Sequence, residues 1–306
     1  MHIIISKKIL FILLLVLITA LQNTFSQTSS DYQNEFTFVF ITDIHIQPER
    51  NAIEGFKKAI EEINKINPDF VITGGDLIYD ALGVGYERAD SLFNLYNETI
   101  SLLNSPVYNT IGNHEIFGWN EKSQVSRVHS EFGKKMYQNR IGKTYYLFDH
   151  KGVRFFILDS IEEVPEGGKY YGFVNDEQVE WLKQELIEID SLTPIIISTH
   201  IPFITTFSQI KAGSQKENER GLVIENSKEV LDLFTGHNLK LVLQGHLHYF
   251  EELNVQNKTT FITAGAVSAR WWRGPNDGME EGFLIVNVNG NKITTRYFDY
   301  GWELLE

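Results

Sequence analysis

The first half of the chain alternates short apolar runs with longer amphipathic segments. The apolar runs are rich in β-branched and aromatic residues, as in Phe36–Thr42 (FTFVFIT), which is typical of buried strands. Between these runs, apolar residues recur at helical spacing, as Phe56, Ile60 and Ile63 do. The pattern predicts strands at 36–42, 70–73 and 107–111 and helices near 53–63 and 86–103. This βαβαβ order predicts a parallel sheet covered by helices.

The second half predicts more strands and two further helices. Lys151-Gly152 and Asn289-Gly290 each join two strand-like runs into a hairpin. Residues Asn175–Ile189 form an amphipathic helix that Asn175 or Asp176 can cap. Strands are expected at 144–149, 153–159, 194–199, 239–244, 261–264, 283–288 and 292–297, and the second helix near 227–234. We therefore expect an α/β fold in which two packed mixed β-sheets are flanked by helices, a four-layer α/β/β/α sandwich. Two long polar connections, 115–142 and 201–221, are typical of functional loops.

The N-terminus is set apart from this pattern. Lys7 and Lys8 precede the apolar run Ile9–Ile18, and small side chains stand at the −3 and −1 positions of a cut before Gln27. We expect residues 1–26 to be a signal peptide and the protein to be exported, periplasmic or secreted, with no stable membrane span after cleavage. An uncleaved anchor is the alternative. No repeat or linker divides the rest, so we expect a single domain over 32–306, with its motif core at 36–250 and C-terminal strands within 259–299.

Composition narrows the chemistry. The 306 residues carry 27 Lys plus Arg against 40 Asp plus Glu, a net charge of −13, which argues against binding to nucleic-acid polymers or anionic membranes. A small phosphorylated substrate is still compatible, because a bound cation reverses the local field. The chain has no cysteine, which excludes disulfides, thiolate metal sites and cysteine nucleophiles. A metal site must therefore use oxygen and imidazole ligands, drawn in part from 9 histidines.

Residues with carboxylate, amide or imidazole side chains follow five of the predicted strands. They are DIH at 43–45, GGD at 74–76, GNHE at 112–115, His200, and GHLH at 245–248. Ligands of open α/β sheets bind beyond the carboxyl ends of the strands, so these residues are expected to converge. Their oxygen and nitrogen donors suit divalent Mn, Fe or Zn. One such motif carries little information, whereas five in order indicate a site.

This order of motifs resembles the calcineurin-like metallophosphoesterase family, whose pattern is D-x-H, G-D, G-N-H-[D/E], H and G-H-x-H. The resemblance covers about 36–250 and implies the same sandwich fold and two divalent metal ions, Mn, Fe or Zn. It implies that Asp76 bridges the two ions and that His114 faces the phosphate. It further implies one ion held by Asp43, His45 and His248, and the other by Asn113, His200 and His246.

The resemblance implies a dinuclear metal-dependent phosphoric ester hydrolase, a phosphatase or phosphodiesterase acting on a small phosphoester. The two ions would lower the pKa of a water that bridges them, and the resulting hydroxide would attack phosphorus in line with the leaving oxygen. Asp76 and His114 are the catalytic residues, and His114 stabilises the developing charge or protonates the leaving oxygen. Glu115 either orients His114 or a ligand, or is a surface carboxylate. The alternatives are an exported Ser/Thr protein phosphatase and a non-catalytic module that binds a phosphate ligand. The substrate, native metals and oligomeric state are left open.

Two local patterns qualify the resemblance. Purple acid phosphatases carry G-D-x-x-Y, which 75–79 (GDLIY) matches, but their first motif has glycine where this chain has His45. We therefore expect a chain that is not of the purple type, with Tyr79 packed behind the ligands. The segment 268–275 (SARWWRGP) resembles exported members and is expected to form a substrate-binding wall of Arg270, Trp271, Trp272 and Arg273. The alternative is that one tryptophan packs in the core while both arginines lie in solvent.

Overall fold

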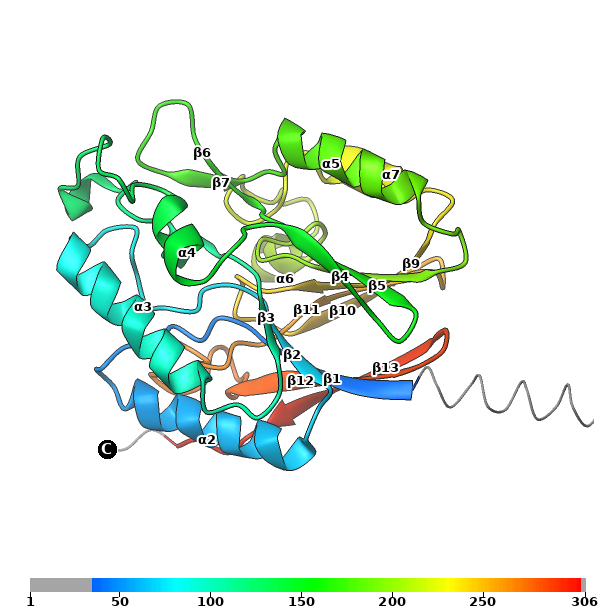
Figure 1. The fold of residues 1–306 in the computed structure, drawn as a ribbon, viewed down its shortest axis with the longest axis horizontal. Helices are drawn as coiled ribbons and strands as arrows, with labels where there is room; N and C mark the ends of the chain where they lie inside the picture. The colour runs from blue at the N-terminus through cyan, green and yellow to red at the C-terminus, as the bar shows by residue number, and fades with distance from the viewer. Residues whose placement is uncertain (1–34, 304–306) are drawn as a thin grey trace, which may run out of the picture.

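The computed structural model describes residues 35–303, in which two β-sheets pack face to face with helices outside them (Figure 1). One sheet has five strands in the order β13-β12-β1-β2-β3, and the other has six in the order β10-β11-β9-β8-β5-β4. Helices α2 and α3 cover the first sheet, and α5 and α7 cover the second. The predicted α/β sandwich is confirmed.

The strands and helices have the following bounds. The first sheet contains β1 (Glu35–Ile41), β2 (Phe70–Thr73), β3 (Val107–Asn109), β12 (Gly282–Asn289) and β13 (Lys292–Asp299). The second contains β4 (Tyr146–His150), β5 (Val153–Ile157), β8 (Pro194–Ser198), β9 (Asn238–Gln244), β10 (Glu251–Val255) and β11 (Thr259–Thr263). A separate hairpin consists of β6 (Ile161–Glu163) and β7 (Tyr170–Gly172). The helices are α2 (Ala52–Ile66), α3 (Tyr86–Ile100), α4 (Lys135–Arg140), α5 (Asp176–Ile187), α6 (Phe207–Ala212) and α7 (Ser227–Leu233), with 3-10 turns η1 (Asn113–Glu115) and η2 (Glu121–Ser123).

The alternation of β1 explains why two apolar layers form. Phe38 packs between the sheets, stacked on Phe70 at 5.1 Å and edge-on to Phe155 of the opposite sheet at 5.6 Å. Val39 points the other way, into the core beneath the helices, which also holds Phe56 of α2. Successive side chains of a strand point to opposite faces, so one strand contributes to both cores.

Strand direction determines where the motifs lie. Strands β1, β2 and β3 are parallel neighbours, and so are β5, β8 and β9. Their carboxyl ends therefore open toward the same edge of the sandwich. The other side of β1 pairs antiparallel with β12, in a register that sets Glu35 opposite Asn289. The first strand of the fold is thus held between β2 and a strand from the end of the chain.

Several predicted local features are confirmed. The β4–β5 and β12–β13 hairpins form as expected. Asn175 caps α5, because its side-chain oxygen accepts a hydrogen bond from the N–H of Gln178 at 3.0 Å. The β6–β7 hairpin, β10, α4 and α6 were not predicted, because the three strands have no continuous apolar run and the two short helices lie within the long polar connections.

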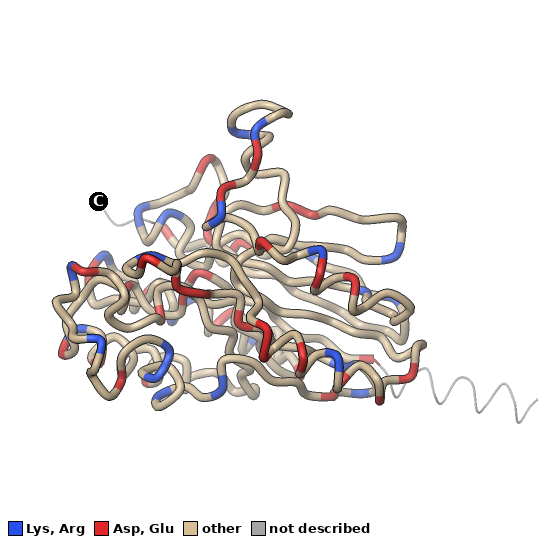
Figure 2. The backbone as a smooth tube through the Cα atoms, turned by 90° about the horizontal axis from the view of Figure 1, so that it is seen from above, with Lys and Arg blue, Asp and Glu red and all other residues tan. Residues whose placement is uncertain are grey.

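Charged residues are frequent on the helices and loops, whereas the central strands of both sheets, such as β2, β8 and β12, carry few or none (Figure 2). Within residues 35–303, no helix is both long enough and apolar enough to cross a membrane. The predicted signal peptide, residues 1–26, lies outside the residues that the structure describes.

Candidate metal centre

The strand-end turns hold site residues in a backbone conformation that L-amino acids rarely adopt. Five of them have positive φ: Asp43 (54°), His45 (46°), Asp76 (53°), His246 (74°) and His248 (49°). Each such residue costs about 1–2 kcal/mol, which the surrounding structure must offset. Hydrogen bonds between the first two turns do this, from Asp43 N–H to the Gly75 carbonyl at 3.0 Å and from His45 N–H to the Asp76 carbonyl at 2.9 Å. Strain concentrated at one edge of the sheets is typical of a functional site.

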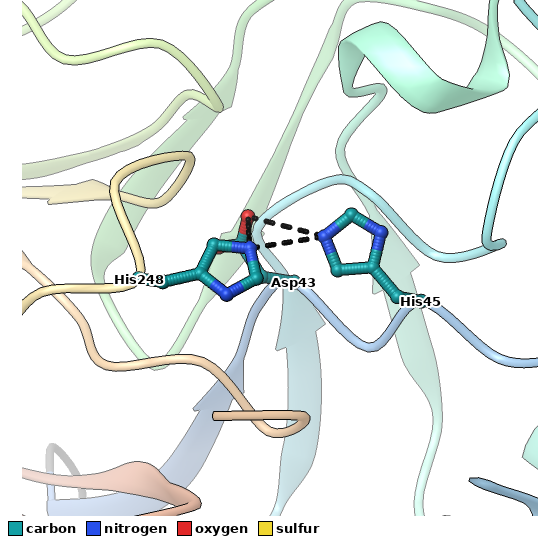
Figure 3. Close-up of side chains that lie close together, drawn as sticks. All are labelled: Asp43, His45 and His248. Atoms are coloured by element: carbon teal, nitrogen blue, oxygen red, sulfur yellow. Dashed lines mark hydrogen bonds and ion pairs between the residues drawn. The ribbon is translucent and has the colours of Figure 1, made fainter. Parts of the chain in front are cut away.

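Asp43, His45 and His248 form the first group of converging side chains (Figure 3). Their ligand atoms all lie within 4.8 Å of one another, and all three residues are buried. His248 Nε2 lies 3.3 Å from Asp43 Oδ1 and 3.0 Å from His45 Nε2. The residues come from the turn after β1 and the turn after β9, which the two sheets bring together.

A second group contains Asp76, His200 and His246. His200 Nε2 lies 3.2 Å from Asp76 Oδ2 and 3.2 Å from His246 Nδ1. The Asn113 side-chain oxygen lies 3.1 Å from the same His200 nitrogen. The structure therefore places the four residues expected around the second ion in one cluster.

Asp76 lies between the two groups. Its Oδ2, which faces His200, is also 3.6 Å from His45 Nε2 and 3.9 Å from His114 Nε2. A carboxylate oxygen in this place can reach cations on both sides. The His114 side chain is 26% exposed, whereas those of His45 and His200 are fully buried. His114 is thus accessible to a ligand from solvent.

Backbone carbonyls orient the imidazole rings. His200 Nδ1 donates to the Gly74 carbonyl at 2.8 Å, His246 Nε2 donates to the Gly221 carbonyl at 2.8 Å, and His248 Nδ1 donates to the Ala269 carbonyl. Because a carbonyl only accepts, each of these nitrogens carries the hydrogen, and the opposite nitrogen faces the cluster as a ligand. Imidazole, carboxylate and amide donors together suit Mn, Fe or Zn. The residues present therefore fit two divalent cations.

The electrostatics of the cluster favour positive charge. Burial works against ionisation of the carboxyl groups, but the neighbouring histidines hold the pKa of Asp76 well below its usual value and lower the pKa of Asp43 to about 2. Burial also opposes protonation of His200, yet Asp76 raises the pKa of that imidazole to about 9. Burial, aided by His200, lowers the pKa of His246 to about 4. Ionised carboxylates are the ligand state that a divalent cation requires, and binding of such a cation through His200 would release the proton that Asp76 stabilises there.

Glu115 is not a surface carboxylate, which removes one of the two roles that the sequence left open. It is fully buried, and its carboxylate accepts backbone hydrogen bonds from Gly112 (2.7 Å), Asp76 (3.0 Å), Leu77 (2.8 Å) and Ile78 (3.1 Å). The two motif loops touch so closely that a Cβ on Gly112 would lie 2.3 Å from the Asp76 backbone nitrogen. Glu115 thus ties together the loops that carry Asp76 and His114.

The two adjacent tryptophans have different environments, which corrects the predicted substrate wall. Trp272 is fully buried, and its indole N–H donates to the Ile44 carbonyl at 2.9 Å while its ring packs edge-on against Trp302. It belongs to the core and does not line the site. Trp271 is partly exposed, with its ring 4.4 Å from that of His248. Arg270 and Arg273 are both exposed, and the Arg270 guanidinium donates to the Arg273 carbonyl.

Sequence reasoning did not single out Tyr170. Its ring stands edge-on to His246, with ring centroids 6.0 Å apart and planes at 83°. The residue lies in β7, a strand of three residues that gave no periodic pattern.

Comparison with known proteins agrees with this arrangement. Residues 36–250 match the family described as calcineurin-like phosphoesterase. The chain belongs to that family. It is therefore a hydrolase that acts on phosphoric ester bonds. The matched range begins in β1 and ends beyond the GHLH motif, so it contains every residue of the cluster described above.

Relatives of this phosphoesterase differ in the ester they are named for. The chain is 25% identical over 260 residues to purple acid phosphatase 3 of Arabidopsis thaliana, covering 77% of this chain and 66% of that one. It is 22% identical over 251 residues to a probable cyclic nucleotide phosphodiesterase of Xenorhabdus bovienii, covering 78% and 88%. Tyr79 is the last residue of the G-D-x-x-Y match to purple acid phosphatases. In this chain it is partly buried against the core, and its backbone carbonyl accepts the hydrogen bond of His114 Nδ1.

A solved structure shares the fold. The dimetal phosphatase from Danio rerio superposes with a TM-score of 0.57 at 17% identity, covering 87% of this chain and 99% of the other.

Proposed function

We propose that this phosphoesterase is a dinuclear metal-dependent hydrolase whose preferred substrates are phosphodiesters. The observation that carries the proposal is the position of Asp76, whose Oδ2 faces both ligand groups, with His200 at 3.2 Å and His45 at 3.6 Å. Two divalent cations held there would supply Lewis acidity toward a phosphoryl oxygen and activate a water for attack. Mn, Fe or Zn suits the donor set.

The residues of the cluster form two sets of ligands, one for each cation. The ligands of one cation would be Asp43, His45 and His248, those of the other Asn113, His200 and His246, with Asp76 shared. The carbonyls of Gly74, Gly221 and Ala269 keep three imidazoles in the ligating orientation.

His114 has a separate role. Its Nδ1 is engaged with the Tyr79 carbonyl, so Nε2 is the atom that faces the substrate and exchanges a proton with the leaving oxygen. Its partial exposure allows this contact, because a substrate can reach the ring from solvent.

The charges around the site favour diesters over monoesters. Among residues 35–303, the ion-pair partners of Asp43 and Asp76 are all histidines, with no lysine or arginine. A monoester carries more negative charge than a diester at neutral pH and benefits more from extra cationic side chains. The relative named for cyclic nucleotides acts on a diester by that name, which agrees with this preference. The net charge of −13 argues against a nucleic-acid polymer as substrate.

A turnover assay tests the proposal. The purified protein is supplied with Mn, Fe or Zn and given bis-p-nitrophenyl phosphate or p-nitrophenyl phosphate. We expect metal-dependent hydrolysis with a higher kcat/KM for the diester, and a loss of at least about hundredfold in Asp76→Asn. The matched control is Asp69→Asn, which removes a carboxylate at the opposite end of the same strand.

Two results would contradict the proposal. Equal loss in Asp69→Asn and Asp76→Asn would show that the cluster is not the site of hydrolysis. A protein that binds metal but hydrolyses neither ester would favour the non-catalytic binding module.

A further inference from the structure

The β6–β7 hairpin is anchored to the segment that orients a metal ligand. The Gly172 N–H donates to the Arg220 carbonyl at 2.9 Å, and the Gly172 carbonyl accepts from the Glu225 N–H at 2.8 Å. A Cβ on Gly172 would lie 2.3 Å from the Val223 carbonyl oxygen, so this close approach requires glycine. The hairpin is therefore held against residues 220–225 by backbone contacts and is not a free loop.

The same segment contacts His246. The Gly221 carbonyl accepts the hydrogen bond of His246 Nε2 at 2.8 Å. A Cβ on Gly221 would lie 4.0 Å from the Tyr170 ring, which places that ring beside Gly221. Tyr170 and His246 are thus positioned by one short stretch of backbone.

Tyr170 reaches from this hairpin to the site. Its ring stands at 83° to that of His246, 6.0 Å between centroids, and the residue remains partly exposed. The exposed part of the ring is therefore accessible to a molecule bound beside His246.

Trp271 lies against the group of Asp43, His45 and His248, as Tyr170 lies against His246 of the second group. Its ring lies 4.4 Å from that of His248 and 5.8 Å from that of His45, and it too is partly exposed. Each ligand group therefore has one accessible aromatic ring against it. A phosphodiester carries two esterifying groups, whereas a monoester carries one.

We propose that Tyr170 is a specificity residue whose ring contacts an esterifying group of the bound phosphodiester on the His246 side. A planar aromatic group is the chemistry that fits, because it can stack on the accessible ring of Tyr170. The inference rests on the proposed diester hydrolysis and adds the residue that selects among diesters.

Two diesters with the same leaving group and the same charge test this role. Bis-p-nitrophenyl phosphate retains an aryl group after hydrolysis, and methyl p-nitrophenyl phosphate retains a methyl group. In Tyr170→Leu, which keeps an apolar side chain without an aromatic face, we expect kcat/KM to fall about tenfold for the aryl diester and less than about twofold for the methyl diester. Tyr170→Phe keeps the ring and is expected to keep the wild-type ratio.

Tyr171→Leu is the matched control. Tyr171 is the next residue of the same strand, and its ring packs on Phe173 and beneath the Arg220 guanidinium. We expect it to leave the ratio of the two kcat/KM values unchanged. Bound metal, measured by atomic emission, is expected to be the same in all variants.

The outcomes separate this assignment from the proposed function. An equal loss for both diesters, or a loss of bound metal, in Tyr170→Leu would show that the residue only supports the fold, which overturns the assignment. If Tyr170→Leu hydrolyses both diesters as fast as the wild type does, the specificity assignment is also overturned, whereas the proposed function stands. A wild-type protein inert toward both diesters overturns the proposed function and the assignment together.

Discussion

The Glu115 carboxylate accepts a hydrogen bond from the backbone N–H of Asp76 at 3.0 Å, and so joins the two loops that carry the central residues of the site. Asp76 has a φ of 53°, a conformation that needs support from its surroundings. Further hydrogen bonds from Gly112, Leu77 and Ile78 to the same carboxylate provide it. The Glu115 side chain thereby determines where Asp76 lies.

Replacing Glu115 by Gln is expected to weaken metal binding. The substitution sets an amide NH2 against backbone N–H groups that need acceptors, so the loops separate. We expect Zn²⁺ affinity to fall about 10–100-fold, as for other residues that orient metal ligands. Competition with a chelating dye measures it, and Glu121→Gln, an exposed glutamate in the same connection, is the control. Unchanged affinity in Glu115→Gln would contradict the positioning role.

The neighbouring tryptophans are expected to affect different properties. Trp272→Ala empties a fully buried site and should lower the free energy of unfolding by about 3–5 kcal/mol. Trp271→Ala removes a partly exposed ring and should cost less than about 1 kcal/mol while lowering turnover. Urea denaturation of both variants beside an ester assay checks this. Equal destabilisation by both would mean that Trp271 also belongs to the core.

Stability is expected to depend on pH through Glu281. Burial, together with the charges of Glu280 and Asp299, raises the pKa of the Glu281 carboxyl from 4.5 to about 7. The folded protein binds this proton more tightly than the unfolded chain, so the contribution to stability present below pH 4.5 is lost as pH rises through about 7.

Glu281→Gln removes this titration. We expect the variant to be more stable than the wild type by about 1–2 kcal/mol at pH 8, with the difference vanishing toward pH 4.5. Urea midpoints at both pH values measure it. A difference that does not change with pH would show that Glu281 carries no raised pKa.

Processing of the N-terminus is expected to remove residues 1–26. Expression of the full chain in a bacterium should give a periplasmic or secreted protein whose sequence begins at Gln27. Leu14→Arg places a charge within the apolar run and should keep the protein in the cytoplasm. Recovery of the uncleaved chain in the membrane fraction would instead support the anchor.

Hydrophobic periodicity predicted most of the fold, and the polar residues at the strand ends predicted where the site lies. The motif at 43–45 and the motif at 245–248 are remote in sequence, yet each follows a buried strand, and parallel strands bring both to one edge. Hydrophobic periodicity and strand direction were sufficient for this convergence.

What the sequence could not reveal depends on tertiary contacts. Glu115 belongs to the GNHE motif, but its role stayed open because its partners are backbone N–H groups, which every residue offers. Trp271 and Trp272 are chemically identical, and only the turn that carries them, with φ values of 51° and 62°, sends one ring to the site and the other to the core. Tyr170 depends on a strand of three residues whose position is fixed by residues 220–225.

The antiparallel pairing of β1 with β12 has a consequence for synthesis. The strand that leads into Asp43 is among the first parts of the described fold to emerge from a ribosome, and its partner, opposite at Asn289, is among the last. Until then β1 has an open edge that can pair with another chain. A nascent chain that contains every metal-binding motif still lacks β12, the strand that covers this edge, so a fragment ending at residue 250 is expected to aggregate.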